Sequence, residues 1–110
     1  MQNIIGKKVR VIIDRPLGSY HPKYPETFYP VNYGYIEESI AGDGEYQDAY
    51  ILGVDRPIKL YEGYVIAIIH RYNDNEDKWV VVNEEVKLSK AEIIKQIIFQ
   101  EKFFSFEVIM

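Results

Sequence analysis

Apolar and polar positions follow one another in short runs, separated by turns rich in glycine, proline or acidic residues. Runs of β-branched, aromatic and other apolar side chains between such turns are typical of strands. Five of these runs predict strands at residues 7–14, 31–40, 46–54, 64–72 and 78–82. A shorter run at residues 105–110 predicts a further strand at the end of the chain.

The periodicity changes after residue 88, where apolar side chains recur at helical spacing. The apolar positions that share this spacing are Ala91, Ile94, Ile97 and Ile98. Ser89 precedes them and is followed three residues later by Glu92, which is the pattern of a capping box. We therefore predict one helix that begins after Ser89, and we expect the isoleucines of this segment to be core residues.

Residues 15–30 contain four prolines and one glycine. This excludes a helix or a central strand, because proline lacks the N–H donor and fixes φ. A long ordered loop is uncommon in a small domain and is often functional. Five or six short strands and one late helix indicate an α+β fold dominated by strands, as a small barrel or a curled sheet. The length of 110 residues fits a single domain over residues 1–110.

The composition narrows the function classes. A net charge of −4 and a pI near 5.2 argue against a protein that coats nucleic acid, since such proteins are usually basic. The absence of cysteine excludes disulfides, zinc–thiolate sites and thiol catalysis. The first residues lack the apolar core of a signal peptide, and no apolar run reaches membrane-spanning length. We therefore predict a cytoplasmic protein with no membrane partner.

Two acidic turns carry the candidate chemistry. Asp43, Glu45 and Asp48 fall within six residues, and a second turn between two predicted strands contains Asp74 and Glu76. Crowded carboxylates repel by about 4 kcal/mol per pair at 4 Å in a surface-like dielectric, so a cation would stabilise them. Oxygen ligands from turns suit Mg²⁺ or Mn²⁺. An isolated acidic turn is more often a solvated hairpin tip, so the turns alone leave both interpretations open.

The run from Tyr29 to Leu52, YPVNYGYIEESIAGDGEYQDAYIL, favours the metal-binding interpretation. It resembles the soluble family I inorganic pyrophosphatases, in which the run reads approximately Tyr-Pro-x-Asn-Tyr-Gly-Tyr-Ile, then Asp-Gly-Asp-Pro-x-Asp and a hydrophobic strand. A joint match of this length is a stronger signal than either half. It covers roughly residues 9–82 and is strongest over residues 28–52. The resemblance implies a five-stranded, OB-like β-barrel with one C-terminal helix packed on it.

The resemblance also implies roles for individual residues. Asp43 and Asp48 would be metal ligands, and Glu45 takes the place of an aspartate that helps to bind and deprotonate the attacking water. Further acidic metal ligands would be Asp14, Asp74 and Glu76. Tyr33 would be the active-site tyrosine near the metals or the phosphate, with Tyr29 behind it.

Basic residues are needed to hold the substrate phosphates. The family has an acidic loop that ends in Asp-x-Lys before a valine-rich strand, so Lys78 is the first candidate here. Lys23 and Arg15, in the proline-rich segment, are further candidates, and His21 lies beside Lys23. The chain is shorter than is usual for the family. It has no evident counterpart of the hairpin that supplies a lysine and an arginine, or of a tyrosine–lysine pair near the end of the helix.

The resemblance and the chemistry of the residues together predict an inorganic pyrophosphatase that hydrolyses diphosphate to two phosphates, with Mg²⁺ or Mn²⁺ as cofactor. Two alternatives stay open. One is a hydrolase of another phosphoanhydride, such as a nucleotide or an organic diphosphate, and the other is a catalytically degenerate barrel that binds an anion or a metal ion. Because bacterial relatives often form symmetric oligomers, we also expect a homo-oligomer, with no nucleic-acid partner.

Overall fold

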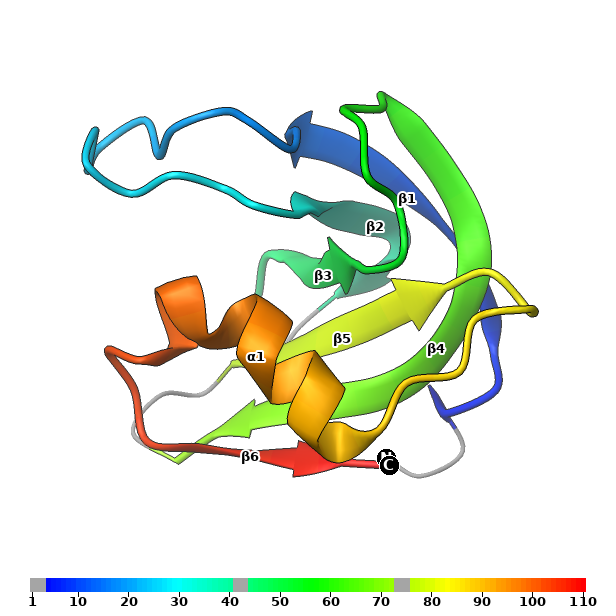
Figure 1. Ribbon diagram of the computed structural model, residues 1–110. Helices are drawn as coiled ribbons and strands as arrows, with labels where there is room; N and C mark the ends of the chain where they lie inside the picture. The colour runs from blue at the N-terminus through cyan, green and yellow to red at the C-terminus, as the bar shows by residue number, and fades with distance from the viewer. Residues whose placement is uncertain (1–3, 41–43, 73–75) are drawn as a thin grey trace.

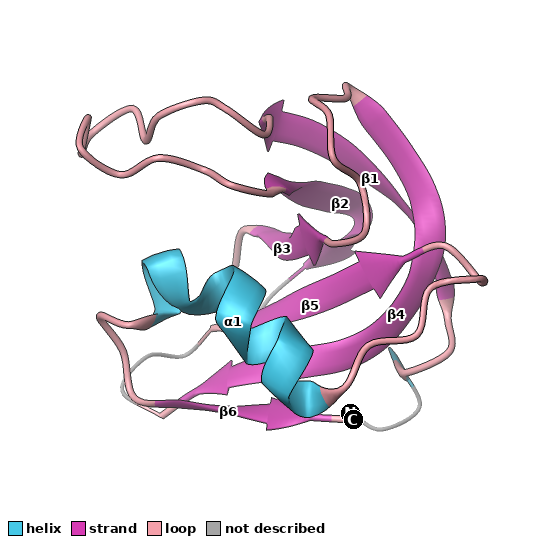
Figure 2. Ribbon diagram, viewed as in Figure 1, coloured by secondary structure: helices cyan, strands magenta, loops and turns pink. Residues whose placement is uncertain are grey.

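The structure is a computed structural model that describes residues 4–40, 44–72 and 76–110. Figures 1 and 2 show strands wrapped into a barrel, with one helix across its outer face and a long loop beside the helix. The elements are β1 (Lys8–Arg15), β2 (Asn32–Ile40), β3 (Tyr46–Ile51), β4 (Leu60–Arg71), β5 (Asp77–Val82), α1 (Lys90–Glu101) and β6 (Phe106–Ile109).

Five of the described strands close the barrel. Their order is β1-β2-β3-β5-β4, and β1 also pairs with β4, so the sheet returns to its starting strand. β3 and β5 run parallel, whereas the other pairings are antiparallel. β6 pairs with β4 and extends the sheet. The predicted five-stranded, OB-like barrel with one C-terminal helix is therefore confirmed.

Two apolar cores lie on opposite faces of the sheet. The inner core fills the barrel, and Ala49 and Ile51 of β3 point into it. The outer core lies between the barrel and α1, and Tyr50 and Leu52 point into it. Because β3 and β5 are covered on both faces, residues 49–51 of β3 and 79–82 of β5 form continuous apolar runs rather than alternating ones.

The helix begins where the sequence predicts, but its isoleucines are not all core residues. Ser89 caps it, and Ser89 and Glu92 form the predicted capping box. The buried positions are Ile93, Ile97 and Glu101, whereas Ala91 and Ile98 are exposed. The core expectation is confirmed for Ile93 and Ile97 and wrong for Ile98. The isoleucines occur in adjacent pairs, and the spacing alone does not decide which member of each pair faces the barrel.

The loop at residues 16–31 runs beside α1 and contains neither a helix nor a central strand, as predicted. An isolated bridge between Tyr20 and Phe28 joins its two arms, and Tyr29 in its second arm is fully buried in the outer core. In the part of the chain that is described, no helix is both long and apolar enough to cross a membrane.

Candidate active site

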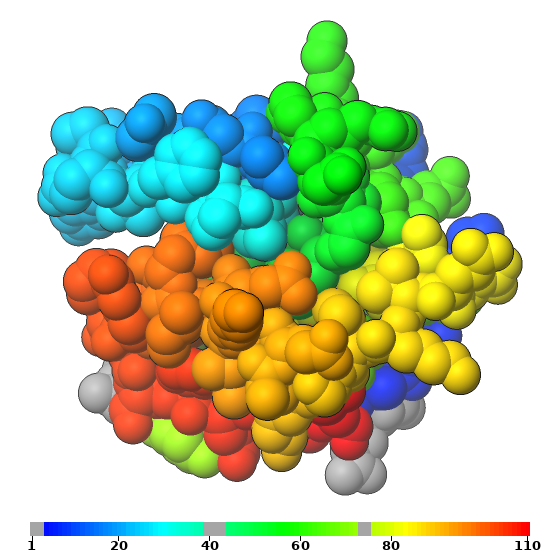
Figure 3. All heavy atoms as spheres, viewed as in Figure 1, coloured from blue at the N-terminus to red at the C-terminus, as the bar shows by residue number. Residues whose placement is uncertain are grey.

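A cavity of about 610 Å³ lies on the outer face of the barrel. The strands contribute Arg15, Tyr33, Asp48, Arg71 and Lys78 to its wall, and Glu76 lines it just before β5. The proline-rich loop and the end of α1 complete the wall, and they face each other in the space-filling view (Figure 3). Predicted site residues from distant parts of the sequence therefore share one cavity.

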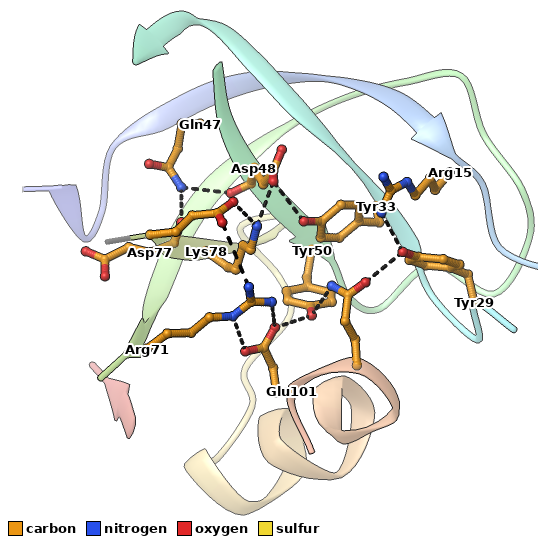
Figure 4. Close-up of polar contacts among 12 residues, drawn as sticks. Arg15, Tyr29, Tyr33, Gln47, Asp48, Tyr50, Arg71, Asp77, Lys78 and Glu101 are labelled. Atoms are coloured by element: carbon orange, nitrogen blue, oxygen red, sulfur yellow. Dashed lines mark hydrogen bonds and ion pairs between the residues drawn. The ribbon is translucent and has the colours of Figure 1, made fainter. Parts of the chain in front are cut away.

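Asp48 is the acceptor on which three neighbouring strands converge (Figure 4). Its Oδ2 accepts a hydrogen bond from the Tyr33 hydroxyl of β2 at 3.0 Å and from Lys78 Nζ of β5 at 2.7 Å. Asp48 itself belongs to β3, which pairs with both of those strands. The sheet therefore fixes all three side chains on the outer face of the barrel.

Lys78 is buried and lies between two carboxylates. Its Nζ bonds to Asp48 and also to Glu76, which lies two residues earlier in the chain. A buried ammonium is stable only where such partners compensate it. Burial raises the pKa of Glu76, Lys78 opposes the shift, and the nearby Asp48 carboxylate adds to it. These three groups form a compact carboxylate–ammonium–carboxylate cluster.

Tyr33 is a hydroxyl donor that stays protonated. Its ring is buried against Tyr29 and Tyr50, with ring centroids 5.7 and 5.0 Å away. Burial raises its pKa well above the usual value, and the charge of Asp48 adds to the shift. The charged ends of Arg15 and Lys78 lie 5.5 and 5.8 Å from its ring centroid, within cation–π range.

A chain of hydrogen bonds runs from the cavity wall into the helix. Arg15 Nη1 donates to the Tyr29 hydroxyl at 2.7 Å, and that hydroxyl donates to Gln100 Oε1 at 2.7 Å. Gln100 Nε2 donates to the Tyr50 hydroxyl at 2.7 Å. The Tyr50 hydroxyl donates to the buried Glu101 Oε2 at 2.6 Å. In each of these bonds the donor is on the Arg15 side of the chain and the acceptor on the Glu101 side; Figure 4 shows both ends of the chain.

A model of the family described as inorganic pyrophosphatase matches residues 7–103 of the chain. This chain belongs to the inorganic pyrophosphatase family. The match extends well beyond the motif segment and includes the helix. Inorganic pyrophosphatases are generally metal-dependent enzymes that act on a small-molecule substrate.

Solved bacterial inorganic pyrophosphatases have the same fold. The enzyme from Ehrlichia chaffeensis aligns with a TM-score of 0.68 at 18% identity, over 94% of this chain and 85% of that one. The enzyme from Helicobacter pylori has a TM-score of 0.66 at 16% identity, over 93% and 82% of the two chains. The Thermus thermophilus enzyme has a TM-score of 0.64 at 20% identity, over 94% and 80%. A search of curated protein sequences found no match.

The predicted site residues of this pyrophosphatase-family chain divide into three groups. Those on the cavity wall are Arg15, Tyr33, Asp48, Glu76 and Lys78. Those described elsewhere are the exposed Asp14, Lys23 and Glu45, and the buried Tyr29. Asp43 and Asp74 lie outside the described residues. Burial raises the pKa of Asp14, Arg15 opposes the shift, and Asp48 adds to it, so Asp14 lies within electrostatic range of the site.

The described residues do not by themselves fit a divalent metal ion. Among them, no group of three or more carboxylate and imidazole side chains is close enough to hold one. Asp48 and Glu76 have hard oxygen donors of the kind that Mg²⁺ prefers, but Lys78 bonds to both of them. Two of the predicted ligands, Asp43 and Asp74, are outside the described part of the chain.

Sequence reasoning missed four polar residues at the site: Tyr50, Arg71, Gln100 and Glu101. Two local signals mark them. His70 and Arg71 are polar residues that follow directly after the apolar run of residues 64–69 in β4. Glu101 lies four residues after Ile97 and eight after Ile93, so a helix with those isoleucines buried also buries a carboxylate. Such a carboxylate requires a cation opposite it.

Proposed function

We propose that this chain hydrolyses inorganic diphosphate to two phosphates with Mg²⁺ as the metal, Mn²⁺ being the second choice. Diphosphate hydrolysis is the activity that names its family. The observation that carries the proposal is the convergence of Tyr33 and Asp48, which belong to the family motif, with Lys78 on the wall of one cavity. A diphosphate is small and highly charged, so positioning and electrostatic stabilisation carry most of its hydrolysis.

The described residues have distinct tasks in the proposed reaction. A water oxygen attacks one phosphorus, the bond from that phosphorus to the bridging oxygen breaks, and orthophosphate leaves. Lys78 and Arg15 lie on the wall and supply positive charge to the phosphoryl oxygens. Tyr33 holds Asp48 in place through its hydroxyl. Glu45, exposed just before β3, is the carboxylate that we propose takes the proton of the water.

We propose that metal ligation involves Asp43 and Asp74 together with Asp48, Glu76 and Asp14. The support for Asp48 and Glu76 is their position on the cavity wall, and that for Asp14 is its electrostatic coupling to Asp48. When bound, a divalent ion lowers the pKa of a water ligand and offsets phosphoryl charge. Carboxylate oxygen donors favour Mg²⁺ or Mn²⁺ over softer metals.

The direct test is phosphate release from pyrophosphate with and without Mg²⁺. We expect rapid release that requires Mg²⁺. Asp48→Asn should abolish it while the far-UV circular dichroism spectrum and the melting temperature stay close to wild type, since asparagine retains the size and an oxygen acceptor. Asp55→Asn, at an exposed position in the loop after β3, is the matched control and should keep full activity. Undiminished turnover by Asp48→Asn would contradict the proposal.

A second candidate function rests on the rim of the cavity. Tyr24 and Phe103 line it and are 57% and 69% exposed, so a planar organic group on a phosphate could stack there. ATP and a sugar diphosphate are therefore assayed beside pyrophosphate. Release mainly from one of these would favour hydrolysis of an organic phosphoanhydride. No release of phosphate from any of them, with Mg²⁺ still binding, would indicate a catalytically inactive barrel that binds a metal ion.

A further inference from the structure

Arg71 is a buried cation on the cavity wall, and it is not part of the acidic and tyrosine motif. It is the last residue of β4 and is only 5% exposed, yet it lines the cavity. A buried guanidinium is costly unless its position is fixed by well-placed partners. Its partners therefore show what orientation the fold imposes on it.

Glu101 and Phe104 fix the orientation of this guanidinium. Arg71 Nε donates to Glu101 Oε1 at 2.8 Å, and Nη2 donates to Glu101 Oε2 at 2.7 Å (Figure 4). The Phe104 ring lies against it, with the ring centroid 3.7 Å from Arg71 Cζ. A bidentate carboxylate and a stacked ring leave little rotational freedom.

The fixed orientation directs a second edge of the guanidinium toward the carboxylate cluster. Glu101 engages the edge formed by Nε and Nη2. Nη1 lies 3.9 Å from Glu76 Oε2, and Glu76 is itself on the cavity wall and bonds to Lys78. Arginine presents five N–H donors on a rigid fork, so one side chain can serve a carboxylate and a phosphate on different edges.

The charge balance of the wall requires such a residue. Lys78 shares its charge between Asp48 and Glu76. Glu101 likewise balances part of the charge of Arg71. A diphosphate carries several negative charges, and a pocket that binds it needs cations to offset them. Besides Lys78, the described lining residues supply two guanidinium groups that are always protonated, those of Arg15 and Arg71. The hydrogen-bond chain through Tyr29, Gln100 and Tyr50 connects Arg15 to the same Glu101 that holds Arg71.

We propose that Arg71 binds a phosphoryl group of the substrate and that Glu101 is the positioning residue that orients it. The ligand class is inorganic diphosphate and its product, orthophosphate. The inference rests on the proposed function, because it names a phosphate-binding residue of the same site.

The test measures orthophosphate binding by isothermal titration calorimetry with the Mg²⁺ concentration held constant, and KM and kcat for pyrophosphate. For Arg71→Met we expect the dissociation constant of phosphate to rise at least tenfold. For Arg71→Lys, which keeps the charge and loses the fork, we expect a smaller rise in KM than for Arg71→Met, with kcat changed less than KM. Arg10→Met, at an exposed position of β1, is the matched control and should leave both quantities unchanged.

A second variant separates binding from folding. Arg71→Met alone leaves Glu101 buried without its cation, which by itself is destabilising. The double variant Arg71→Met/Glu101→Met replaces both charges with apolar side chains, an exchange that is often tolerated. We expect it to fold and still to bind phosphate at least tenfold more weakly than wild type. Glu101→Gln keeps Arg71 but weakens its anchor, so KM should rise, and the melting temperature should fall because Arg71 loses its charged partner.

Either of two results with the variants would overturn the inference. One is wild-type phosphate affinity in the folded double variant, and the other is an unchanged KM in Arg71→Lys together with unchanged phosphate affinity in Arg71→Met. A different result would show that the proposed hydrolase function is wrong while the binding role of Arg71 is right. A wild-type protein that binds phosphate through Arg71 but releases none from pyrophosphate would refute the hydrolase and retain the binding site. A wild-type protein that binds no phosphate would overturn the role of Arg71.

Discussion

Two buried tyrosines illustrate how environment sets chemistry at the scale of the residue. Tyr33 and Tyr50 have pKa values well above the usual one, mainly because burial disfavours a phenolate and also because each faces a carboxylate. Both therefore stay protonated and donate, Tyr33 to Asp48 and Tyr50 to Glu101. Asp48 and Glu101 are thus each held by a tyrosine hydroxyl that keeps its proton throughout the physiological pH range.

His21 gives a pH-dependent prediction at this scale. Partial burial lowers its pKa from 6.5, and the charges of Arg15 and Lys23 lower it further. Its Nδ1 accepts hydrogen bonds from the backbone N–H groups of Lys23 and Tyr24, at 3.0 and 3.3 Å, as a neutral ring does. The His21 ring of the unfolded chain therefore binds a proton more readily than the ring of the folded chain. The contribution of His21 to stability is present above about pH 6.5 and is lost as the pH falls below that value.

An NMR titration of the His21 ring protons checks this sign. We expect a midpoint below 6.5 in the wild type. In Lys23→Gln the midpoint should rise, because one neighbouring positive charge is removed. A wild-type midpoint above 6.5, or a midpoint that falls in Lys23→Gln, would contradict the lowered pKa of His21 and its cause.

At the scale of the element, the local pattern predicted which strands and helix exist more accurately than it predicted the residues at which they begin and end. β5 begins one residue before the predicted strand, but β4 begins at Leu60, four residues before the predicted 64. Those residues have a mixed polar sequence, and they become strand because they pair with β1, from Lys8 to Ile12. Pairing with a distant strand therefore extended an element that its own sequence would have ended earlier.

The glycine at position 34 gives a prediction for the pairing of β1 with β2. A Cβ there would lie 2.0 Å from the Ile12 carbonyl oxygen, so the two backbones approach too closely for any side chain. Gly34→Ala should destabilise the fold by about 3 kcal/mol, as overpacking does. Gly18 has open space and positive φ, so Gly18→Ala should cost only the left-handed strain, about 1–2 kcal/mol. Urea unfolding of both variants checks the order, and an equal or reversed order would contradict it.

At the scale of the whole molecule, the site depends on the association of two layers. The barrel supplies Asp48, Lys78 and Arg71, whereas α1 supplies Gln100 and Glu101. The outer core between them is built from strands, the loop, α1 and β6. Loss of the helix layer would leave Arg71 without its carboxylate, so we expect the barrel and the helix to unfold together. The expected homo-oligomer and cytoplasmic location stay predictions.

Trp79, the single tryptophan of the sequence, tests this cooperativity. It lies in the inner core, whereas most of the helical signal comes from α1 on the outer face. For one cooperative unit, tryptophan fluorescence and circular dichroism at 222 nm should report the same urea midpoint. Separate midpoints would contradict both the coupling of the layers and the prediction of a single domain over residues 1–110.

The sequence by itself determined the strand and helix pattern, the capped start of α1, and the family motif that includes Tyr33 and Asp48. These features depend on neighbouring residues, because hydrophobic periodicity, capping and motif spacing are local. Only the tertiary structure decided that Lys78 lies between two carboxylates, and that Arg71 meets Glu101 from 30 residues away. Such pairs form because a buried charge is stable only beside a charge of opposite sign. The closure of the barrel and the packing of the helix determine which charged side chains lie next to each other.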